Sequence, residues 1–344
     1  MCNPTISVVM PAYNAGKFLD EAVCSILDQT FRDFEFIIVD DGSTDDTAFI
    51  LEKYAKADSR LRVFRQANEG MISALNRGCR LVRGYFIARM DADDISLHHR
   101  FERQLDYIEK NPKVGIVGTW ITEIAIDGSV RGNWCPSPLP KVLRWRHFFG
   151  GCVHHPSVLI RREILEKIDF YRPDAVHVED IDLWLRASAI TEFGNVPELL
   201  FKYRVWDGSV SQQRRLKARE IHMNLMASFI SEFLGVDPPF KAITGLKARE
   251  CESLQQVLLA ATLLESLYWS FQEANPLNTE EYLEISSDAA KRMAMLAFQA
   301  LQFKSVTFLS LLMRAFRLNH RLLSPSVIIR NLNRARLLQL LGAR

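Results

Sequence analysis

Short apolar runs alternate with amphipathic segments along the first third of the chain. The runs have the length of buried strands, and the segments between them repeat apolar residues every three or four positions, as helices do. The predicted strands cover residues 6–10, 35–39, 61–64, 85–88 and 114–117. Because strand and helix alternate with short connections, the pattern predicts an α/β fold, a mostly parallel sheet with helices on both faces.

The pattern changes beyond about residue 212, where the helical repeats become long and prolines separate them. These repeats cover residues 254–269, 282–303, 306–318 and 327–341. Their length and apolar periodicity predict a C-terminal all-helical region. We therefore expect two domains, one at residues 1–212 and a helical one at residues 213–344, with the distinctive polar motifs in the first.

Polar residues follow four of the predicted strands, at the end where each strand stops. These segments are Pro11-Ala12-Tyr13-Asn14, Asp40-Asp41, Asn68-Glu69-Gly70 and Asp91-Ala92-Asp93. The carboxyl ends of parallel strands meet at one edge of a sheet, and ligands of open α/β folds bind beyond that edge. Packing alone gives little reason for polar residues to gather there, so the pattern predicts a binding site.

Three carboxylates lie within four residues, at Asp91, Asp93 and Asp94. Neighbouring carboxylates repel each other unless a cation lies between them, and hard dications such as Mg²⁺ take one or two carboxylates together with substrate phosphates. An isolated Asp-x-Asp is more often a solvated acidic turn before a helix. The polar residues at the other three strand ends favour a metal site instead.

The sequence lacks the glycine motifs by which other folds bind phosphates, and this narrows the class of ligand. No G-x-G-x-x-G follows the first strand and no G-x-x-x-x-G-K-[ST] occurs, so no glycine loop brings backbone amides to phosphates. A metal at Asp91 and Asp93 could neutralise a diphosphate instead. Asp41 could accept a hydrogen bond from a base, and the Tyr13 ring could cover its face. This predicts a nucleoside diphosphate that carries a transferable group, and no nucleic-acid partner is expected.

Five motifs follow one another along the first domain. They are Ile6–Asn14, Ser25–Phe31, Ile38–Asp45, Asn68–Gly70 with Asn76, and Asp91–Asp94. Their order and spacing resemble the family 2 glycosyltransferases of the GT-A fold, of the bacterial envelope or capsular-polysaccharide type, over roughly residues 5–211. The resemblance implies a nucleotide-sugar-binding fold and an inverting transfer of a sugar from a nucleotide diphosphate, usually UDP, with Mg²⁺ or Mn²⁺.

The resemblance also implies roles for single residues. By motif position, Asp91 lies near the ribose and the metal, and Asp93 is the direct metal ligand. The residues implied to bind the donor are Pro11, Ala12, Tyr13, Asp41, Asn68, Asp91 and Ala92. These roles are expectations that rest on the family likeness.

A second acidic motif, Glu179-Asp180, resembles the Glu-Asp motif that opens a helix in the same family. Inversion needs a base that removes the proton of the acceptor hydroxyl on the face opposite the leaving diphosphate. A carboxylate at a helix start is also ordinary N-terminal charge placement. In this context the catalytic interpretation is favoured, with Asp180 as the base and Glu179 as the second candidate.

Two later segments leave alternatives open. Residues 151–157 are similar to the segment that precedes the family's acceptor region, but His154 and His155 could equally be satisfied core residues. Residues 203–211 match the family's last motif, except that Trp206 stands where many relatives carry His. Arg204 in this motif is a candidate phosphate contact, and a structural ion pair is an equal alternative.

Composition and charge also bear on where in the cell the protein acts. The six cysteines show no C-x-x-C pair and no signal peptide is apparent, which favours a reducing, cytoplasmic setting. From Ala289 onward there are ten Lys or Arg and no Asp or Glu. Arg314, Arg317 and Arg321 recur at helical spacing, which predicts either peripheral contact with the inner face of the cell membrane or packing against the acidic body or a second subunit. Residues 293–313 are broken by polar residues and make a poor membrane span.

The combined hypothesis is a metal-dependent, inverting glycosyltransferase that acts on a hydroxyl of a glycan or lipid-linked acceptor. A sugar-nucleotide pyrophosphorylase is one alternative, but it would need a glycine-rich, basic loop after the first strand, and residues 11–16 do not form one. The other alternative is a non-catalytic nucleotide-sugar-binding scaffold. The presence of Asp91, Asp93 and Asp180 argues against it.

Overall fold

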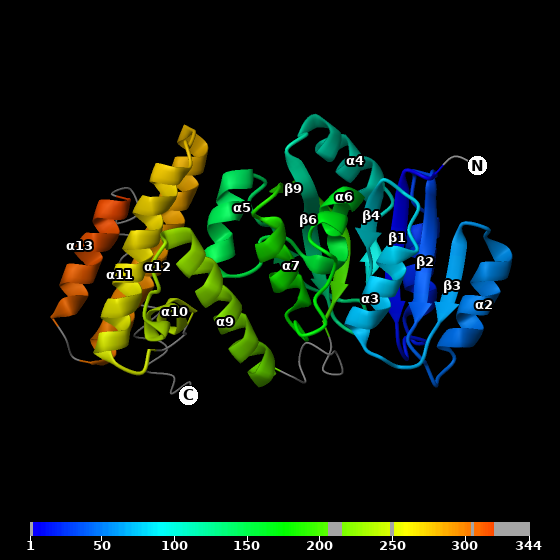
Figure 1. Cartoon of the computed structure of the whole chain (residues 1–344), viewed down its shortest axis with the longest axis horizontal. Helices are drawn as coiled ribbons and strands as arrows, with labels where there is room; N and C mark the ends of the chain where they lie inside the picture. Colours follow the sequence, from blue (N-terminus) through cyan, green and yellow to red (C-terminus); the bar gives the residue numbers. More distant parts are fainter. Residues whose placement is uncertain (1–2, 206–214, 248–250, 304–305, 320–344) are drawn as a thin grey trace. The chain divides into compact units, whose positions relative to one another are not determined.

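The computed structural model describes residues 3–205, 215–247, 251–303 and 306–319. The chain divides into two compact units, Met1–His222 and Met223–Arg344, here called the α/β unit and the helical unit (Figure 1). The domain boundary expected after residue 212 lies outside the described residues. Each unit is built as its sequence pattern predicts, one from strands and helices and the other from helices alone.

Four parallel strands form one half of the sheet in the α/β unit, in the order β3-β2-β1-β4. They are β1 (Ile6–Ala12), β2 (Phe34–Asp40), β3 (Leu61–Arg65) and β4 (Phe86–Arg89). Every residue of β1 and β2 is buried, as expected for strands that are covered on both faces. Because all four strands run the same way, their carboxyl ends lie on one edge.

Helices cover both faces of this sheet, and alternate residues of β1 show how. Val8 and Met10 pack into the cluster that holds α1, α2 and α4, whereas Val9 packs with α3, α6 and α7 on the opposite face. On the first face lie α1 (Leu19–Leu27), α2 (Thr47–Ala57) and α4 (Arg100–Lys110). On the other lie α3 (Met71–Arg80), α6 (Arg162–Lys167) and α7 (Glu179–Ala187). The α/β prediction with helices on both faces is confirmed.

The other half of the sheet is mixed, which the apolar runs did not reveal. β8 pairs antiparallel with both β4 and β6, β9 runs parallel to β6, and β5 and β7 pair antiparallel at the margins. These strands are β5 (Ile95–Ser96), β6 (Val114–Ile124), β7 (Val130–Trp134), β8 (Leu159–Arg161) and β9 (Glu192–Arg204), and α5 (Pro140–Arg146) lies between β7 and β8. An apolar run shows that a strand is buried but not which neighbour it pairs with or in which direction.

The loops at the carboxyl edge are tied to one another. The Asn14 backbone N–H donates to Ser43 Oγ at 3.0 Å, and the Thr44 N–H donates to Asn14 Oδ1 at 2.8 Å. Gly42 adopts a φ of 76°, and a Cβ at this position would lie 2.8 Å from the Asn68 backbone nitrogen. Only glycine fits such a close approach, so the loops after β1, β2 and β3 form one connected rim.

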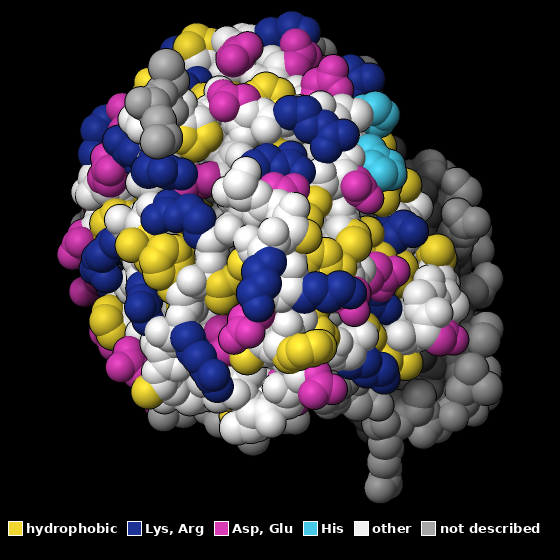
Figure 2. Space-filling view, turned by 90° about the vertical axis from the view of Figure 1, so that its right-hand side faces the viewer, with side chains coloured by type: hydrophobic (Ala, Val, Ile, Leu, Met, Phe, Trp, Pro, Cys, Tyr) yellow, Lys and Arg dark blue, Asp and Glu magenta, His cyan; other side chains and the backbone are white. Residues whose placement is uncertain are grey.

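Acidic and basic side chains are interspersed on the α/β unit where α2 and β3 lie, as Figure 2 shows. One-sided charge is therefore not a feature of this face. It contrasts with the sequence after Ala289, which holds basic residues and no acidic ones.

The helical unit packs long amphipathic helices against one another. Its helices are α10 (Phe240–Lys247), α11 (Leu254–Ala274), α12 (Thr279–Gln302) and α13 (Thr307–Leu318), and α9 (Arg215–Leu234) crosses the division between the units. Asn278 and Glu281 form a capping box at the start of α12, which satisfies backbone N–H groups there. The helix expected at residues 327–341 lies outside the described residues. No helix in the described part of the chain is long and apolar enough to cross a bilayer.

Candidate active site

Three carboxylates gather immediately after β4. Asp91, Asp93 and Asp94 each place one oxygen within 4.8 Å of the others. Asp91 and Asp93 are partly exposed and Asp94 is buried. Oxygen ligands at this spacing suit a hard dication such as Mg²⁺ or Mn²⁺, with open positions left for phosphate oxygens. The residues present therefore fit the metal that the sequence led us to expect.

Arg204 braces this acidic loop. Its backbone N–H donates to Asp94 Oδ1 at 2.8 Å, its Nε donates to the Asp93 carbonyl at 2.8 Å, and its Nη2 donates to Glu21 Oε2 at 2.5 Å. The guanidinium is almost fully buried. Of the two alternatives that the sequence left open for Arg204, the structure shows the ion pair. Residues 206–211 of the same motif lie outside the described residues.

Asp94 differs from its two neighbours because one of its oxygens, Oδ2, is buried without a hydrogen-bond partner. Burial, together with the charges of Asp91 and Asp93, raises the pKa of this carboxyl well above its usual range. An unpaired buried carboxylate oxygen is costly unless a proton or a cation compensates it. A bound positive charge would therefore stabilise the loop.

The residues expected to hold the nucleoside lie along the neighbouring strand ends. Pro11 and Ala12 are buried at the end of β1, whereas Tyr13 is 51% exposed and Asn68 is exposed. The Asp41 backbone N–H donates to the Ala12 carbonyl at 2.9 Å, which joins the ends of β1 and β2. The sheet therefore brings these residues to one edge, beside the acidic loop.

Asp41 itself is held by the loop that follows β3. Its Oδ1 accepts hydrogen bonds from Gln66 Nε2 at 2.8 Å and from the Glu69 N–H at 3.0 Å, and its Oδ2 accepts one from the Gly70 N–H at 2.8 Å. These bonds fix the carboxylate and the loop together. The sequence did not reveal them, because nothing in the motif shows which amides face Asp41.

The second acidic pair lies in the first turn of α7. Glu179 is 7% exposed and its Oε2 has no hydrogen-bond partner, whereas Asp180 is partly exposed and its Oδ1 accepts a hydrogen bond from the Ile181 N–H at 2.8 Å. Burial and the adjacent Asp180 charge raise the pKa of Glu179 to about 7. Burial also raises the pKa of Asp180. A carboxyl pair with raised pKa values can accept a proton near neutral pH.

Arg89 is in contact with Asp91 and interacts electrostatically with Glu179 and Asp180, a role that its sequence position did not predict. Its side chain is 4% exposed, and its Nη1 donates to Asp91 Oδ2 at 2.5 Å. Its positive charge opposes the effect of burial on the pKa of both Glu179 and Asp180. The available signal was a charged residue at the end of the apolar run 85–88, just before the acidic motif.

The two histidines of the segment before β8 pack against aromatic side chains, His155 buried and His154 partly exposed. His155 Nε2 and the Tyr171 hydroxyl are hydrogen-bonded at 2.8 Å, and the His155 ring lies edge-on to Trp184. The His154 ring packs edge-on against Tyr203, and burial lowers its pKa to about 3. Of the two interpretations that the sequence left open, the satisfied core residue fits His155, whereas His154 is packed but its Nδ1 has no hydrogen-bond partner.

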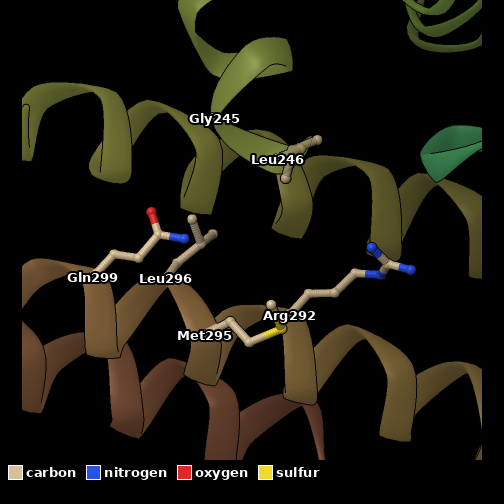
Figure 3. A pocket seen from close by; sticks show the side chains of 6 residues that line it. All are labelled: Gly245, Leu246, Arg292, Met295, Leu296 and Gln299. Atoms are coloured by element: carbon tan, nitrogen blue, oxygen red, sulfur yellow. The ribbon is translucent and has the colours of Figure 1, made fainter. Parts of the chain in front are cut away.

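A pocket in the helical unit contrasts with this acidic edge. It lies between α10 and α12, as Figure 3 shows, and the only charged side chain that lines it is Arg292. Arg292 Nε donates to Asp288 Oδ2 at 2.7 Å. This pocket is not lined by a carboxylate pair. We therefore assign the candidate active site to the α/β unit, which has two acidic groups.

Comparisons with known proteins agree with this assignment. The family model described as glycosyl transferase family 2 matches residues 7–169. An uncharacterised glycosyltransferase of Haemophilus influenzae is 30% identical over 284 residues, which cover 78% of this chain and 87% of that protein. The O-antigen biosynthesis glycosyltransferase WbnJ of Escherichia coli is 31% identical over 214 residues, 60% of this chain and 82% of that protein.

The fold has a counterpart among solved structures. The structure of S. aureus TarS in complex with UDP-GlcNAc superposes with a TM-score of 0.56 and 17% sequence identity. The match covers 91% of this chain and 89% of that one. At this level of identity the likeness concerns the fold, and it includes both the sheet and the helices that follow it in the chain.

Proposed function

The chain belongs to glycosyl transferase family 2, and on that premise we propose a metal-dependent, inverting transfer of a sugar from a UDP-sugar to a hydroxyl of a glycan or lipid-linked acceptor. It is a glycosyltransferase that uses a nucleotide-sugar donor and resembles enzymes of envelope-polysaccharide synthesis. The observation that carries the proposal is the presence of two acidic groups, Asp91 to Asp94 and Glu179-Asp180, that both interact electrostatically with the buried Arg89.

The donor side of the proposal rests on the strand-end rim. Tyr13 is exposed beside Asp41 and Asn68, so its ring is available to cover a base. Asp91 and Asp93 would hold Mg²⁺ or Mn²⁺, which when bound offsets the negative charge of the departing diphosphate. The choice of UDP is supported by the TarS complex with UDP-GlcNAc. Pro11, Ala12 and Ala92 would contact the donor through their backbone atoms and shape the surface around it.

The acceptor side rests on the first turn of α7. We propose Asp180 as the base, because it is the more exposed of the two carboxylates and an acceptor hydroxyl must reach it. Asp180 takes the hydroxyl proton as the acceptor oxygen bonds to the anomeric carbon, and the bond from that carbon to the diphosphate oxygen breaks. Glu179, more deeply buried and with a pKa of about 7, remains the second candidate. The protein thus contributes positioning and electrostatics.

The division of labour between the two parts of the chain is also a proposal. Residues 1–212 would carry the chemistry, and residues 213–344 would place the enzyme near its acceptor at the inner face of the cell membrane. In support, one side of α13 and the residue before it expose Val306, Leu309, Met313 and Phe316 by 50–87%. Arg317 is exposed beside them, whereas Arg314 pairs with Glu265 at 2.6 Å. Arg321, Arg330, Arg334 and Arg336 lie outside the described residues.

A panel of nucleotide-sugars tests the donor assignment. Each donor is added with Mg²⁺ or Mn²⁺, and thermal stabilisation and release of nucleoside diphosphate are measured. A donor that binds the folded protein raises the melting temperature by mass action. We expect a UDP-sugar to give the largest metal-dependent shift. A response to another nucleotide, or one that is indifferent to chelation, would contradict the proposal.

A further inference from the structure

Arg89 is a buried cation whose position is fixed by the backbone around it. Its N–H donates to the Val158 carbonyl at 3.0 Å, and its own carbonyl accepts from Arg100 Nη2 at 2.9 Å. The side chain is 4% exposed at the end of β4. Arginine is almost never fully buried without a partner, so the charges near Arg89 must explain why the site keeps it.

The hydrogen-bond partner of the guanidinium is one of the two carboxylates that we assign to the dication. Nη1 donates to Asp91 Oδ2 at 2.5 Å, while Nε is buried and has no hydrogen-bond partner. A guanidinium stays protonated in proteins, and its ion pair with Asp91 stabilises the charge of Arg89 against the cost of burial. The side chain is therefore charged, and part of its donor capacity is unused.

The same charge acts on the acidic pair of α7. The charged groups that affect the pKa of Glu179 are Asp180 on its own helix, Arg89 at the end of β4 and Asp91 in the loop after β4. Asp91 and Asp180 raise the pKa of Glu179, and Arg89 lowers it. The same three charged groups, Arg89, Glu179 and Asp180, also affect the pKa of Tyr171 in the loop before α7. One cation thus acts on two acidic groups whose negative charges repel each other.

We infer that Arg89 is a positioning residue shared by both acidic groups: it holds Asp91 in place, competes with a dication for that carboxylate, and supplies the counter-charge that lets Glu179 and Asp180 lie near the donor site. This inference rests on the proposed function, since it takes Asp91 as a ligand of the dication. It goes further in assigning one residue to both the donor side and the acceptor side.

Two measurable consequences follow from the charge of Arg89. Removing the guanidinium charge frees Asp91 and removes a repulsive cation, so a dication alone should bind more tightly. The same change leaves Glu179 and Asp180 without their counter-charge, so the apparent pKa of the base should rise. A residue that only fills space would produce neither shift, because a packing defect does not favour cation binding.

The experiment compares three substitutions with the wild-type protein. Arg89→Met and Arg89→Gln remove the charge, and Arg89→Lys retains it. Arg62→Met is the matched control, because Arg62 shares Glu35 with Arg83 far from the acidic edge. Mn²⁺ alone is titrated by calorimetry, and transfer is measured as a function of pH. Thermal melting checks that each variant is folded.

We expect the neutral variants to bind Mn²⁺ about tenfold more tightly than wild type and to shift the acidic limb of the pH profile upward by about one unit. The Lys variant and Arg62→Met should stay near wild type in both measurements. Unchanged or weaker Mn²⁺ binding in folded neutral variants would overturn the inference. So would failure of both neutral variants to fold, since Arg89 would then be needed for the fold itself. Absence of Mn²⁺ binding to wild type even with UDP would instead contradict the proposed metal site.

Discussion

The acidic edge of the α/β unit and the core of the helical unit treat buried polar atoms differently. At the edge, Arg89 Nε, Asp94 Oδ2 and Glu179 Oε2 are buried without hydrogen-bond partners, and Glu179 has a strongly raised pKa. In the helical unit, by contrast, Gln272 Nε2 is a neutral amide nitrogen that is buried without a partner, whereas Gln299 accepts from the Cys251 N–H at 2.9 Å and Asn319 donates to Ser286 Oγ at 2.9 Å. Unsatisfied buried charge costs stability, so its concentration at one edge indicates a site shaped for a charged ligand.

The largest expected effect separates the chemical step from donor binding at the acidic edge. Asp180→Asn should lower the turnover of transfer by ~10²–10⁴-fold, the usual loss when a general base is removed. Donor affinity should stay nearly unchanged, because the base acts in the transition state and not on the bound donor. Steady-state kinetics and calorimetry with UDP check the two halves of this statement.

The matched control is Asp174→Asn, which changes an exposed carboxylate in the loop before α7. It should leave turnover within about twofold of wild type, as expected for a solvated surface group. Near-normal turnover in Asp180→Asn would move the base to Glu179 or out of this motif altogether.

The next effect concerns the donor side of the same edge. Asp93→Asn removes a charged oxygen ligand from a site that suits a hard dication. Divalent-dependent UDP binding should therefore fall roughly tenfold or more, because losing even a group that only hydrogen-bonds to a metal ligand lowers metal affinity by that factor. Calorimetry with UDP and Mn²⁺ measures it. Asp46→Asn, at an exposed position before α2, serves as the control. Wild-type affinity in Asp93→Asn would show that this carboxylate is not a ligand.

The sequence predicted the features that depend on local pattern, and it did not predict those that depend on contacts between distant segments. The apolar runs and their spacing predicted β1 to β4, the helices between them and the polar strand ends, because these features are written in consecutive residues. The sequence did not predict that β8 runs antiparallel to β4, or that the charge of Arg89 acts on two acidic groups distant in the chain. Asp41 was recognised by its motif, but its bonds to Gln66 and Gly70 depend on how two loops meet. Pairing and burial between distant segments are set by the folded packing.

A smaller effect links the acidic edge to stability through pH. The pKa of Glu179 rises from 4.5 to about 7 on folding, so the folded protein keeps a proton that the unfolded chain releases. The stability present below pH 4.5 is therefore lost as the pH rises toward 7, by about 1–3 kcal/mol. Glu179→Gln should remove this loss and raise the melting temperature at pH 8 relative to wild type.

Melting curves of both proteins between pH 4 and pH 8 test this statement. Glu265→Gln is a control in the helical unit, where the carboxylate is partly exposed and pairs with Arg314. It should not flatten the pH dependence. Parallel curves for wild type and Glu179→Gln would mean that the carboxyl is ionised in the folded protein, and the contrast between the two regions would weaken.

The smallest effect concerns α13 of the helical unit, whose exposed apolar residues set it apart from the acidic edge. Burying an apolar side chain is worth about 1.5–3 kcal/mol when complete, and each basic residue near an anionic leaflet adds about 1 kcal/mol. We expect the protein to co-sediment with anionic vesicles at low salt, less so at high salt, and little with neutral vesicles. Leu309→Glu with Met313→Glu should weaken this binding several-fold, because both side chains are 62% exposed and a charge there opposes insertion. Val236→Glu, at another exposed apolar position of the same unit, should not. If wild type stays in the supernatant with anionic vesicles at low salt, the apolar side of α13 is instead a contact within the protein or between subunits.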